Sequence, residues 1–335
     1  MNIWITGIAG FLGSHLAESL KAQGHNVYGN DSGICNSMPI SPLFKFDCTD
    51  FEKMKRNLKH FEIDTIVHCA ATAAEGLSVF SPYFITRNIA EASVATFSAA
   101  ISAGVKRIVN FSSMARYGHG YVSGSLLIGP PFDENYETNP VDPYGVAKVY
   151  AENQLKLLCK EYGVKWANVV PHNVVGTHQQ ITPYRNVITI FLNRLKQNLP
   201  VYIYGDGLQK RSFSPVKDCL HSLLQIIDGA MDGQTINIGP DDNEITINEA
   251  LEMCEQVTGV VANRIYLPPR PITDTVKNAY CSSDKARKYL GYRSQQHLID
   301  CIREMSDEMQ PVKFNYDFPI EILTDKTPKT WTDKL

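Results

Sequence analysis

Three features are missing from this sequence of 335 residues, and each absence excludes a class of protein. Its 32 basic residues are balanced by 35 acidic ones, so the composition gives no support to a nucleic-acid-binding surface. Its eight cysteines never form a C-x-x-C motif, which argues against a disulfide framework or a zinc site and favours reduced thiols in the cytoplasm. The longest nearly uncharged apolar stretch, around 66–74, is far shorter than the ~18 residues that cross a membrane. The first apolar run, at residues 3–5, predicts a strand rather than a signal peptide.

The first half of the chain alternates short apolar runs with helical patterns. Strands are predicted at 2–6, 26–29, 43–46, 65–69, 107–111 and 165–170, and helices at 11–23, 50–60, 82–103 and 144–162. Strands that alternate with helices predict an α/β fold with a doubly wound parallel sheet of the Rossmann type.

The pattern changes after about Gly176, where clusters of glycine, proline and aspartate appear. We therefore predict a dinucleotide-binding domain at 1–176, to which a helix at 217–227 returns, and a smaller α+β substrate-binding lobe at 177–310. Residues 311–335, rich in lysine, aspartate, threonine and proline, are predicted to form a C-terminal tail on the surface.

A glycine-rich turn follows the first predicted strand. Its glycines, Gly7, Gly10 and Gly13, have the spacing G-x-x-G-x-x-G and enclose Phe11 and Leu12 at the start of a helix. Glycine lets a pyrophosphate approach the backbone, and the helix N-terminus supplies free N–H groups. Asp31, at the end of the second strand, can hold the ribose hydroxyls. With no arginine beside it, this carboxylate favours NAD over NADP.

A tyrosine and a lysine are spaced for proton transfer. Tyr144 and Lys148 lie four residues apart at the start of a predicted helix, so they share one face. An ammonium near a phenol is expected to lower the phenol's pKa, so that the tyrosine can take a proton from a sugar hydroxyl. Ser113, after the fifth strand, supplies a hydroxyl that completes the site.

Several further motifs occur in the same order along the chain. They are Asp47, His68-Cys-Ala-Ala71, Phe111-Ser-Ser-Met-Ala-Arg-Tyr-Gly118 and Tyr204-Gly-Asp-Gly-Leu-Gln-Lys-Arg211. With the glycine turn and the Tyr144/Lys148 pair, they resemble the extended short-chain dehydrogenase/reductase family. The resemblance is to its NAD-dependent nucleotide-sugar epimerase/dehydratase branch, and it runs from residue 2 to about residue 292.

The resemblance implies a tightly held NAD, a nucleoside-diphosphate-sugar substrate and a homodimer joined by the helices at 82–103 and 144–162. It implies that the catalytic residues are Ser113, Tyr144 and Lys148. The implied cofactor-binding residues are Gly7, Gly10, Phe11, Leu12, Gly13, Asp31, Asp47, Ala70, Tyr144 and Lys148. The implied substrate-binding residues are Glu75, Ser78, Ser113, Asn173, Arg211 and Arg270.

Two positions after Ser113 separate the reactions of this branch. Its 4,6-dehydratases carry an acid pair there, whereas Met114 and Ala115 can move no proton. The glutamate of the decarboxylases and the cysteine of the 3,5-epimerases are also absent. Oxidation, rotation of a keto intermediate and reduction from the other face remain, which is 4-epimerisation. Arg116 replaces a residue that is usually small and apolar.

Other functions stay open on the sequence. A nucleotide-sugar dehydrogenase, a 4-keto reductase or a dehydratase that uses Glu75 are alternatives among enzymes. An NAD-binding redox regulator is the alternative outside enzymes, because fold alone does not establish function. His172 and His178 lack a nearby cysteine or paired acid, so no metal site is predicted there.

Overall fold

The computed structural model describes residues 1–33, 43–123, 126–242 and 244–335. Its centre is a parallel sheet with the strand order β13-β8-β5-β4-β1-β2-β3. The strands are β1 (Asn2–Thr6), β2 (Asn26–Asp31), β3 (Phe44–Lys45), β4 (Thr65–His68), β5 (Arg107–Phe111), β8 (Lys165–Pro171) and β13 (Gln234–Ile238). The predicted α/β fold is confirmed, and the order reverses between β1 and β4.

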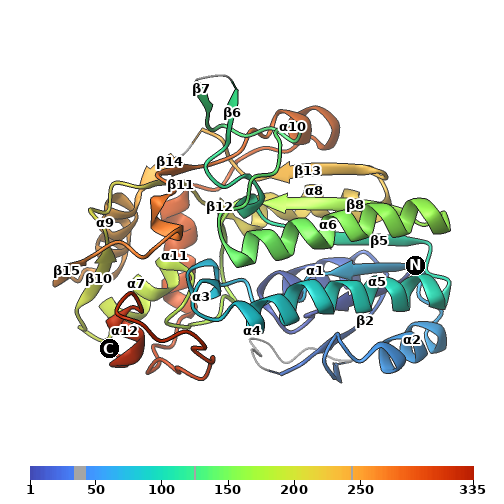
Figure 1. Ribbon diagram of the computed structural model, residues 1–335, viewed down its shortest axis with the longest axis horizontal. Helices are drawn as coiled ribbons and strands as arrows, with labels where there is room; N and C mark the ends of the chain where they lie inside the picture. The colour runs from blue at the N-terminus through green and yellow to red at the C-terminus, as the bar shows by residue number, and fades with distance from the viewer. Residues whose placement is uncertain (34–42, 124–125, 243) are drawn as a thin grey trace.

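Helices cover both faces of the sheet (Figure 1). One face packs against α1 (Phe11–Ala22), α8 (Val216–Asp228) and α10 (Asp284–Leu290). The other packs against α2 (Phe51–His60), α5 (Ala92–Ala103) and α6 (Pro143–Tyr162). With both faces buried, the strands carry continuous apolar runs rather than an alternating pattern. Trp4 on β1 is fully buried, and its indole N–H donates to the Asn30 side chain over 2.9 Å.

Local signals fix the ends of the two long helices. Asp142 caps α6 by accepting from the backbone N–H of Gly145 over 2.8 Å, and Gly163 ends this helix in the left-handed region. Gly104 ends α5 in the same way. The helix predicted at 82–103 is continuous but not uniform, because a π-helical turn at Arg87–Glu91 separates α4 (Pro82–Thr86) from α5.

A second hydrophobic core lies in the C-terminal half of the chain. It is formed by apolar side chains of α7 (Val187–Lys196), β10 (Val201–Tyr204), α9 (Ile247–Thr258) and α11 (Leu298–Glu308). The remaining elements are β6 (Tyr121–Ser123), β7 (Leu126–Ile128), β9 (Val174–Val175), β11 (Lys210–Ser212), β12 (Ser214–Pro215), β14 (Glu244–Thr246), β15 (Arg264–Leu267), β16 (Asn278–Ala279), α3 (Glu75–Ser78) and α12 (Lys329–Thr332), with 3₁₀ turns at Met114–Tyr117 and Thr273–Thr275.

Three elements after residue 176 return to the first core, namely α8, β13 and α10. Helix α8 packs beside α1, and β13 then pairs with β8 at the edge of the sheet. Sequence analysis predicts the helix but not this strand. Nothing in the sequence around residues 234–238 tells whether a strand there joins the large sheet or belongs to the lobe.

The C-terminal segment departs from its prediction as a surface tail. Trp331 on α12 is only 4% exposed, and Thr330 is hydrogen-bonded to Tyr204 of β10. Phe318 stacks on Tyr184 with ring centroids 5.3 Å apart. These aromatic contacts outweigh the polar composition of the segment and bury part of it.

Two more observations bear on the sequence predictions. Among the described residues, no helix combines the length and apolarity that crossing a bilayer requires. The seven cysteines within the described ranges are unpaired thiols; the eighth, at position 35, lies outside them.

Candidate active site

A cavity of ≈ 500 Å³ lies at the carboxyl ends of the sheet strands. In α/β folds, ligands bind at this edge, where the strand order reverses. Segments that follow β1, β2, β4, β5 and β8 form one wall, and residues of the C-terminal half form the opposite wall. Of the site residues predicted from sequence, all except Ser78 line this cavity. Ser78 is fully buried beneath the loop, and its hydroxyl donates to the carbonyl of Glu75 over 2.6 Å.

The glycine turn is a close-fitting backbone cradle. Gly7 has a φ of +67°, and a Cβ atom at this position would lie 2.9 Å from the Cα of Ala70. A Cβ at Gly13 would lie 2.1 Å from the carbonyl oxygen of Gly7. Any side chain at these positions would therefore displace backbone. Gly10 is the N-cap of α1, and no side chain caps its free N–H groups, which leaves them available to an anion.

Two carboxylates lie at the far end of this cradle. Asp31 is 8% exposed, and its Oδ1 accepts from the backbone N–H of Gly33 over 2.9 Å. Burial raises the pKa of Asp31, while N–H groups of Gly33 and Ala9 oppose the rise. The Oδ1 of Asp47 accepts from the N–H and the hydroxyl of Thr49, each over 2.8 Å. This bonding holds the Asp47 carboxylate in a fixed orientation beside the cavity.

The predicted catalytic residues come from two elements. Ser113 follows β5 and caps a 3₁₀ turn, accepting from the N–H of Ala115 over 3.2 Å. Tyr144 and Lys148 face the cavity from the first turns of α6. The Lys148 Nζ donates to the carbonyl of Phe111 over 2.7 Å and lies 5.9 Å from the centroid of the Tyr144 ring. The structure thus brings the three side chains to one wall.

Burial dominates the pKa of the Tyr144 phenol. Burial raises the pKa of Tyr144 to about 12, although the Ser113 side chain and the charge of Arg185 act to lower it. Burial also lowers the pKa of Lys148 to about 8. Lys148 is bonded to a backbone carbonyl instead of the phenol oxygen, so the desolvation of Tyr144 dominates.

Arg116 faces neither the sugar side nor the solvent. Its side chain is 5% exposed, and its Nη2 lies 3.2 Å from Oε2 of Glu152, which is 1% exposed. The hydroxyl of Ser112 donates to the other carboxylate oxygen of Glu152. Glu152 lies one helical turn after Lys148 and acts to raise the pKa of that lysine. This buried ion pair therefore lies directly behind the catalytic wall.

Glu75 lies between the two walls of the cavity. Its charge acts to raise the pKa of Tyr144, Arg211 and Arg270. Burial, together with the charge of Glu75, raises the pKa of Asp142, the N-cap of α6. The structure thus places Glu75 where an acid, a base or a hydroxyl ligand could act.

The predicted phosphate-binding arginines lie on the opposite wall. The Arg211 guanidinium donates to the carbonyls of Lys210, Val276 and Lys277 over 2.8 to 3.2 Å. Arg270 forms an ion pair with Asp274, with Nη2 and Oδ1 2.7 Å apart.

The predicted substrate asparagine lies between the two walls. Asn173 lines the cavity, and its Nδ2 donates to the carbonyl of Ser212 over 3.0 Å. Its backbone has a φ of +24°.

Sequence reasoning misses several residues that line the cavity. They are Asp274 and, from the C-terminal segment, Tyr316, Phe318, Thr330 and Trp331. One signal was available: Phe314, Tyr316 and Phe318 alternate with polar residues, which is unusual in a solvated tail.

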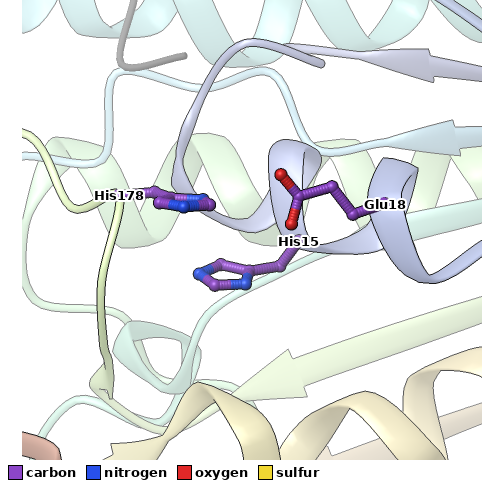
Figure 2. Close-up of side chains that lie close together, drawn as sticks. All are labelled: His15, Glu18 and His178. Carbon is purple, nitrogen blue, oxygen red and sulfur yellow. The ribbon is translucent and has the colours of Figure 1, made fainter. Parts of the chain in front are cut away.

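Three metal-ligating side chains meet outside the cavity (Figure 2). Donor atoms of His15, Glu18 and His178 lie within 4.8 Å of one another. However, the two imidazole rings stack with centroids 4.5 Å apart and planes 15° apart, so their in-plane lone pairs do not converge on one point. His15 also bonds the carbonyl of Thr177 over 3.0 Å. In this geometry the cluster ties the segment after β9 to α1.

The fold and the residues that line the cavity define a Rossmann-type dinucleotide-binding protein with a tyrosine–lysine pair beside its cavity. The chain belongs to the NAD dependent epimerase/dehydratase family, whose model matches residues 3–239. It is 29% identical over 314 residues to the UDP-glucose 4-epimerase of Mycolicibacterium smegmatis, covering 90% of this chain and 96% of that one.

Two solved structures are similar over nearly their whole length. The UDP-glucose 4-epimerase of Thermotoga maritima, solved with UDP-glucose, has a TM-score of 0.83 and 27% identity and covers 92% of this chain and 98% of its own. The UDP-glucose 4-epimerase of Thermus thermophilus, solved with NAD, has a TM-score of 0.83 and 26% identity at the same coverage.

The residues present fit NAD, the cofactor of this family. The Gly7 and Gly13 cradle leaves no room for side chains, and α1 begins with free N–H groups beside it. Asp31 ends β2 at the place where a ribose-binding carboxylate is expected. The prediction of NAD is confirmed.

Proposed function

We propose that this protein is an NAD-dependent epimerase of nucleoside-diphosphate sugars that inverts C4 through a transient 4-keto sugar. The observation that carries the proposal is the composition of the catalytic wall. Ser113, Tyr144 and Lys148 share this wall, while Met114, which also lines it, and the adjacent Ala115 offer no proton donor or acceptor. Such a wall supports removal and return of one hydroxyl proton and does not support the expulsion of water.

Tyr144 acts as the proton acceptor for the C4 hydroxyl in this proposal. When bound, NAD supplies a hydride acceptor and a cationic ring whose charge favours the phenolate. Ser113 supplies a hydroxyl beside the phenol, and Lys148 supplies a positive charge from the same helix. Because burial holds the pKa of Tyr144 near 12 without ligands, the phenolate forms only when these charges are assembled.

The opposite wall holds the diphosphate in this proposal. Arginine presents a planar fork that suits phosphate oxygens, and both Arg211 and Arg270 line the cavity. In the ligand-free protein, carbonyls satisfy Arg211 and Asp274 satisfies Arg270. These partners orient the two guanidinium groups, whose remaining N–H donors would bind phosphate oxygens, and Asn173 provides an amide nearby.

The test follows the hydrogen at the inverted carbon. In 4-epimerisation this hydrogen leaves C4 as hydride and returns to C4, so it does not exchange with water. UDP-glucose is the first substrate to assay, because it is the ligand of the similar Thermotoga maritima structure. Turnover in D₂O, followed by NMR and mass spectrometry, is expected to give UDP-galactose without deuterium on carbon and without net NADH absorbance.

Other outcomes identify the alternatives. Deuterium at C3 or C5 would contradict the assignment as a 4-epimerase and would favour a reaction in which Glu75 acts as the base. Stoichiometric NADH would show a dehydrogenase. Tight NAD binding with no turnover across a panel of nucleotide sugars would favour a redox regulator.

We further propose a homodimer that works in the cytoplasm. Val146, Tyr150 and Leu157 lie along one side of α6 and are 54%, 46% and 63% exposed, respectively, and Tyr83 on α4 is 74% exposed. An apolar surface of this kind on two adjacent helices suits a helical interface between two copies. The unpaired described cysteines suit a reducing compartment.

We also propose that the chain divides functionally at about residue 176. Residues 1–176, with the returning helix α8, would hold the dinucleotide, and residues 177–310 would hold the nucleoside diphosphate. The separate hydrophobic core of α7, α9 and α11 supports this division.

A further inference from the structure

The C-terminal segment, residues 311–335, crosses from the lobe to the Rossmann unit. At the lobe, Val312 and the Asn193 side chain of α7 exchange two hydrogen bonds, over 2.9 and 3.0 Å. At the Rossmann unit, Glu321 accepts from the N–H groups of Tyr83 and Phe84, over 2.9 and 2.7 Å. We call this segment the strap.

The attachment to α4 is specific rather than incidental. Ser81, the N-cap of α4, makes no side-chain cap hydrogen bond, so the carboxylate of Glu321 satisfies two N–H groups at the helix start. The hydroxyl of Ser81 instead donates to the carbonyl of Pro319. The N–H groups of Glu321 and Ile322 both donate to the carbonyl of Phe80 over 2.9 Å. These contacts fix the strap to residues 80–84, which follow the short helix α3 that begins at Glu75.

Trp331 of the strap lines the cavity close to Gly76 and to one of the two arginines. A Cβ atom built on Gly76 would lie 2.7 Å from Nη1 of Arg270 and 3.6 Å from Cη2 of Trp331. Gly76 thus sits between the indole and an arginine assigned to the diphosphate. Trp331 also belongs to the same contiguous apolar cluster as Tyr144. In a bound nucleotide sugar, the hexose occupies the space between the diphosphate and the reacting hydroxyl.

Aromatic neighbours hold the indole ring in this position. Trp331 packs edge-on against Phe80, with centroids 5.8 Å apart, and against Tyr184, with centroids 5.2 Å apart. Figure 1 shows the strap, in red, with α12 beside α7 and close to α3. Trp331, although only 4% exposed, is therefore a fixed apolar side chain in the lining of a cavity that the charged Glu75 and Arg270 also line.

We propose that Trp331 is a specificity-determining residue of the hexose subsite, and that the strap exists to hold it there. The inference rests on the proposed function. An aromatic side chain offers a broad apolar surface that packs on the C–H face of a sugar ring, while charged groups bond its hydroxyls. A nucleoside diphosphate without the hexose lacks the ring that would pack on the indole.

The experiment compares two probes, UDP and UDP-glucose, by isothermal titration of the NAD-loaded protein. Trp331→Ala is expected to weaken the affinity for UDP-glucose about 10-fold and to leave the affinity for UDP unchanged, because only the hexose contacts the indole. Trp331→Phe keeps an aromatic surface and is expected to restore most of the affinity for UDP-glucose. Glu321→Gln, which weakens the attachment of the strap, is expected to show the same selectivity to a smaller degree.

Trp166→Phe on β8 is the matched control. This tryptophan packs against the hydrophobic core that α6 helps to form, and it does not line the cavity. Equal loss of UDP and UDP-glucose in Trp331→Ala would overturn the proposal, because it would show a general effect on the fold or the diphosphate site. Unchanged binding of both would overturn it as well. Failure of the proposed function would give a different result. The wild-type protein would then bind UDP-glucose without epimerising it, while Trp331→Ala would still lose affinity for UDP-glucose and not for UDP.

Discussion

The two walls of the cavity are built in different ways. The sheet-side wall carries the glycine turn after β1, Ser113 after β5, and Tyr144 and Lys148 on α6. The opposite wall gathers Arg211, Arg270 and Trp331 from segments that lie about 60 residues apart in the chain. The large parallel sheet positions the first wall, whereas short strands, turns and side-chain contacts between distant segments position the second.

This difference separates the chemistry from the binding. On the sheet-side wall, the Lys148 ammonium is bonded to a strand carbonyl, and a buried ion pair lies behind it. On the opposite wall, backbone carbonyls orient Arg211 and the Asp274 carboxylate orients Arg270. We therefore expect substitutions on the first wall to lower kcat and substitutions on the second to raise KM.

The largest effect is expected from Tyr144→Phe. The ring and its packing remain and only the proton acceptor is lost, so turnover should fall by roughly 10²–10⁴-fold or more while NAD stays bound. Steady-state kinetics and the cofactor content of the purified variant measure the two effects. A variant with a near-normal rate would show that proton transfer does not depend on this wall.

The next largest effect concerns the support behind the sheet-side wall. Glu152→Leu leaves the Arg116 guanidinium buried without its carboxylate, which should cost about 3–5 kcal/mol of stability. The double variant Arg116→Met/Glu152→Leu removes both charges and should recover most of that loss. Urea unfolding of the single and double variants measures the coupling. Additive losses would mean that the two side chains act independently.

Arg211→Ala tests the opposite wall. Loss of a charged hydrogen bond is worth about 1.5–3 kcal/mol, so the affinity for UDP-glucose should fall roughly 10- to 150-fold with little change in kcat. Arg303→Ala on α11 is the control, because this arginine is half exposed and its ion pair is with Asp300 of the same helix. A fall in kcat instead of affinity would assign Arg211 to the chemistry.

The smallest effect is a loss of stability in mild acid. Burial lowers the pKa of His68 to about 3 and that of His172 to about 4. The unfolded chain, with histidine pKa values near 6.5, then binds more protons than the folded protein as the pH falls below this value. As the pH falls from 7 to 5.5, His68 and His172 should each lower the free energy of unfolding by about 1 kcal/mol.

His172→Gln should remove about half of the loss that these two histidines cause, measured by urea unfolding at the two pH values. His60→Gln, at the exposed end of α2, should leave the pH dependence unchanged. A wild-type protein equally stable at pH 7 and 5.5 would mean that these rings accept protons without unfolding.

The sequence by itself determined the parts of the protein that depend on local pattern. Alternating strands and helices predict the α/β fold, and the spacing G-x-x-G-x-x-G before a helix predicts the turn from Gly7 to Gly13. The i, i+4 spacing of Tyr144 and Lys148 places both on one helix face. Each of these features follows from hydrogen-bond geometry within a few residues.

Only the tertiary structure decided the rest. It shows Arg116 paired with Glu152 rather than near the sugar, residues 234–238 in the sheet, and Trp331 buried in the cavity instead of on a surface tail. The phenol of Tyr144 has a raised pKa because burial outweighs the Ser113 hydrogen bond and the charge of Arg185. Burial and pairing depend on segments that meet only after folding, so composition and spacing along the chain do not encode them locally.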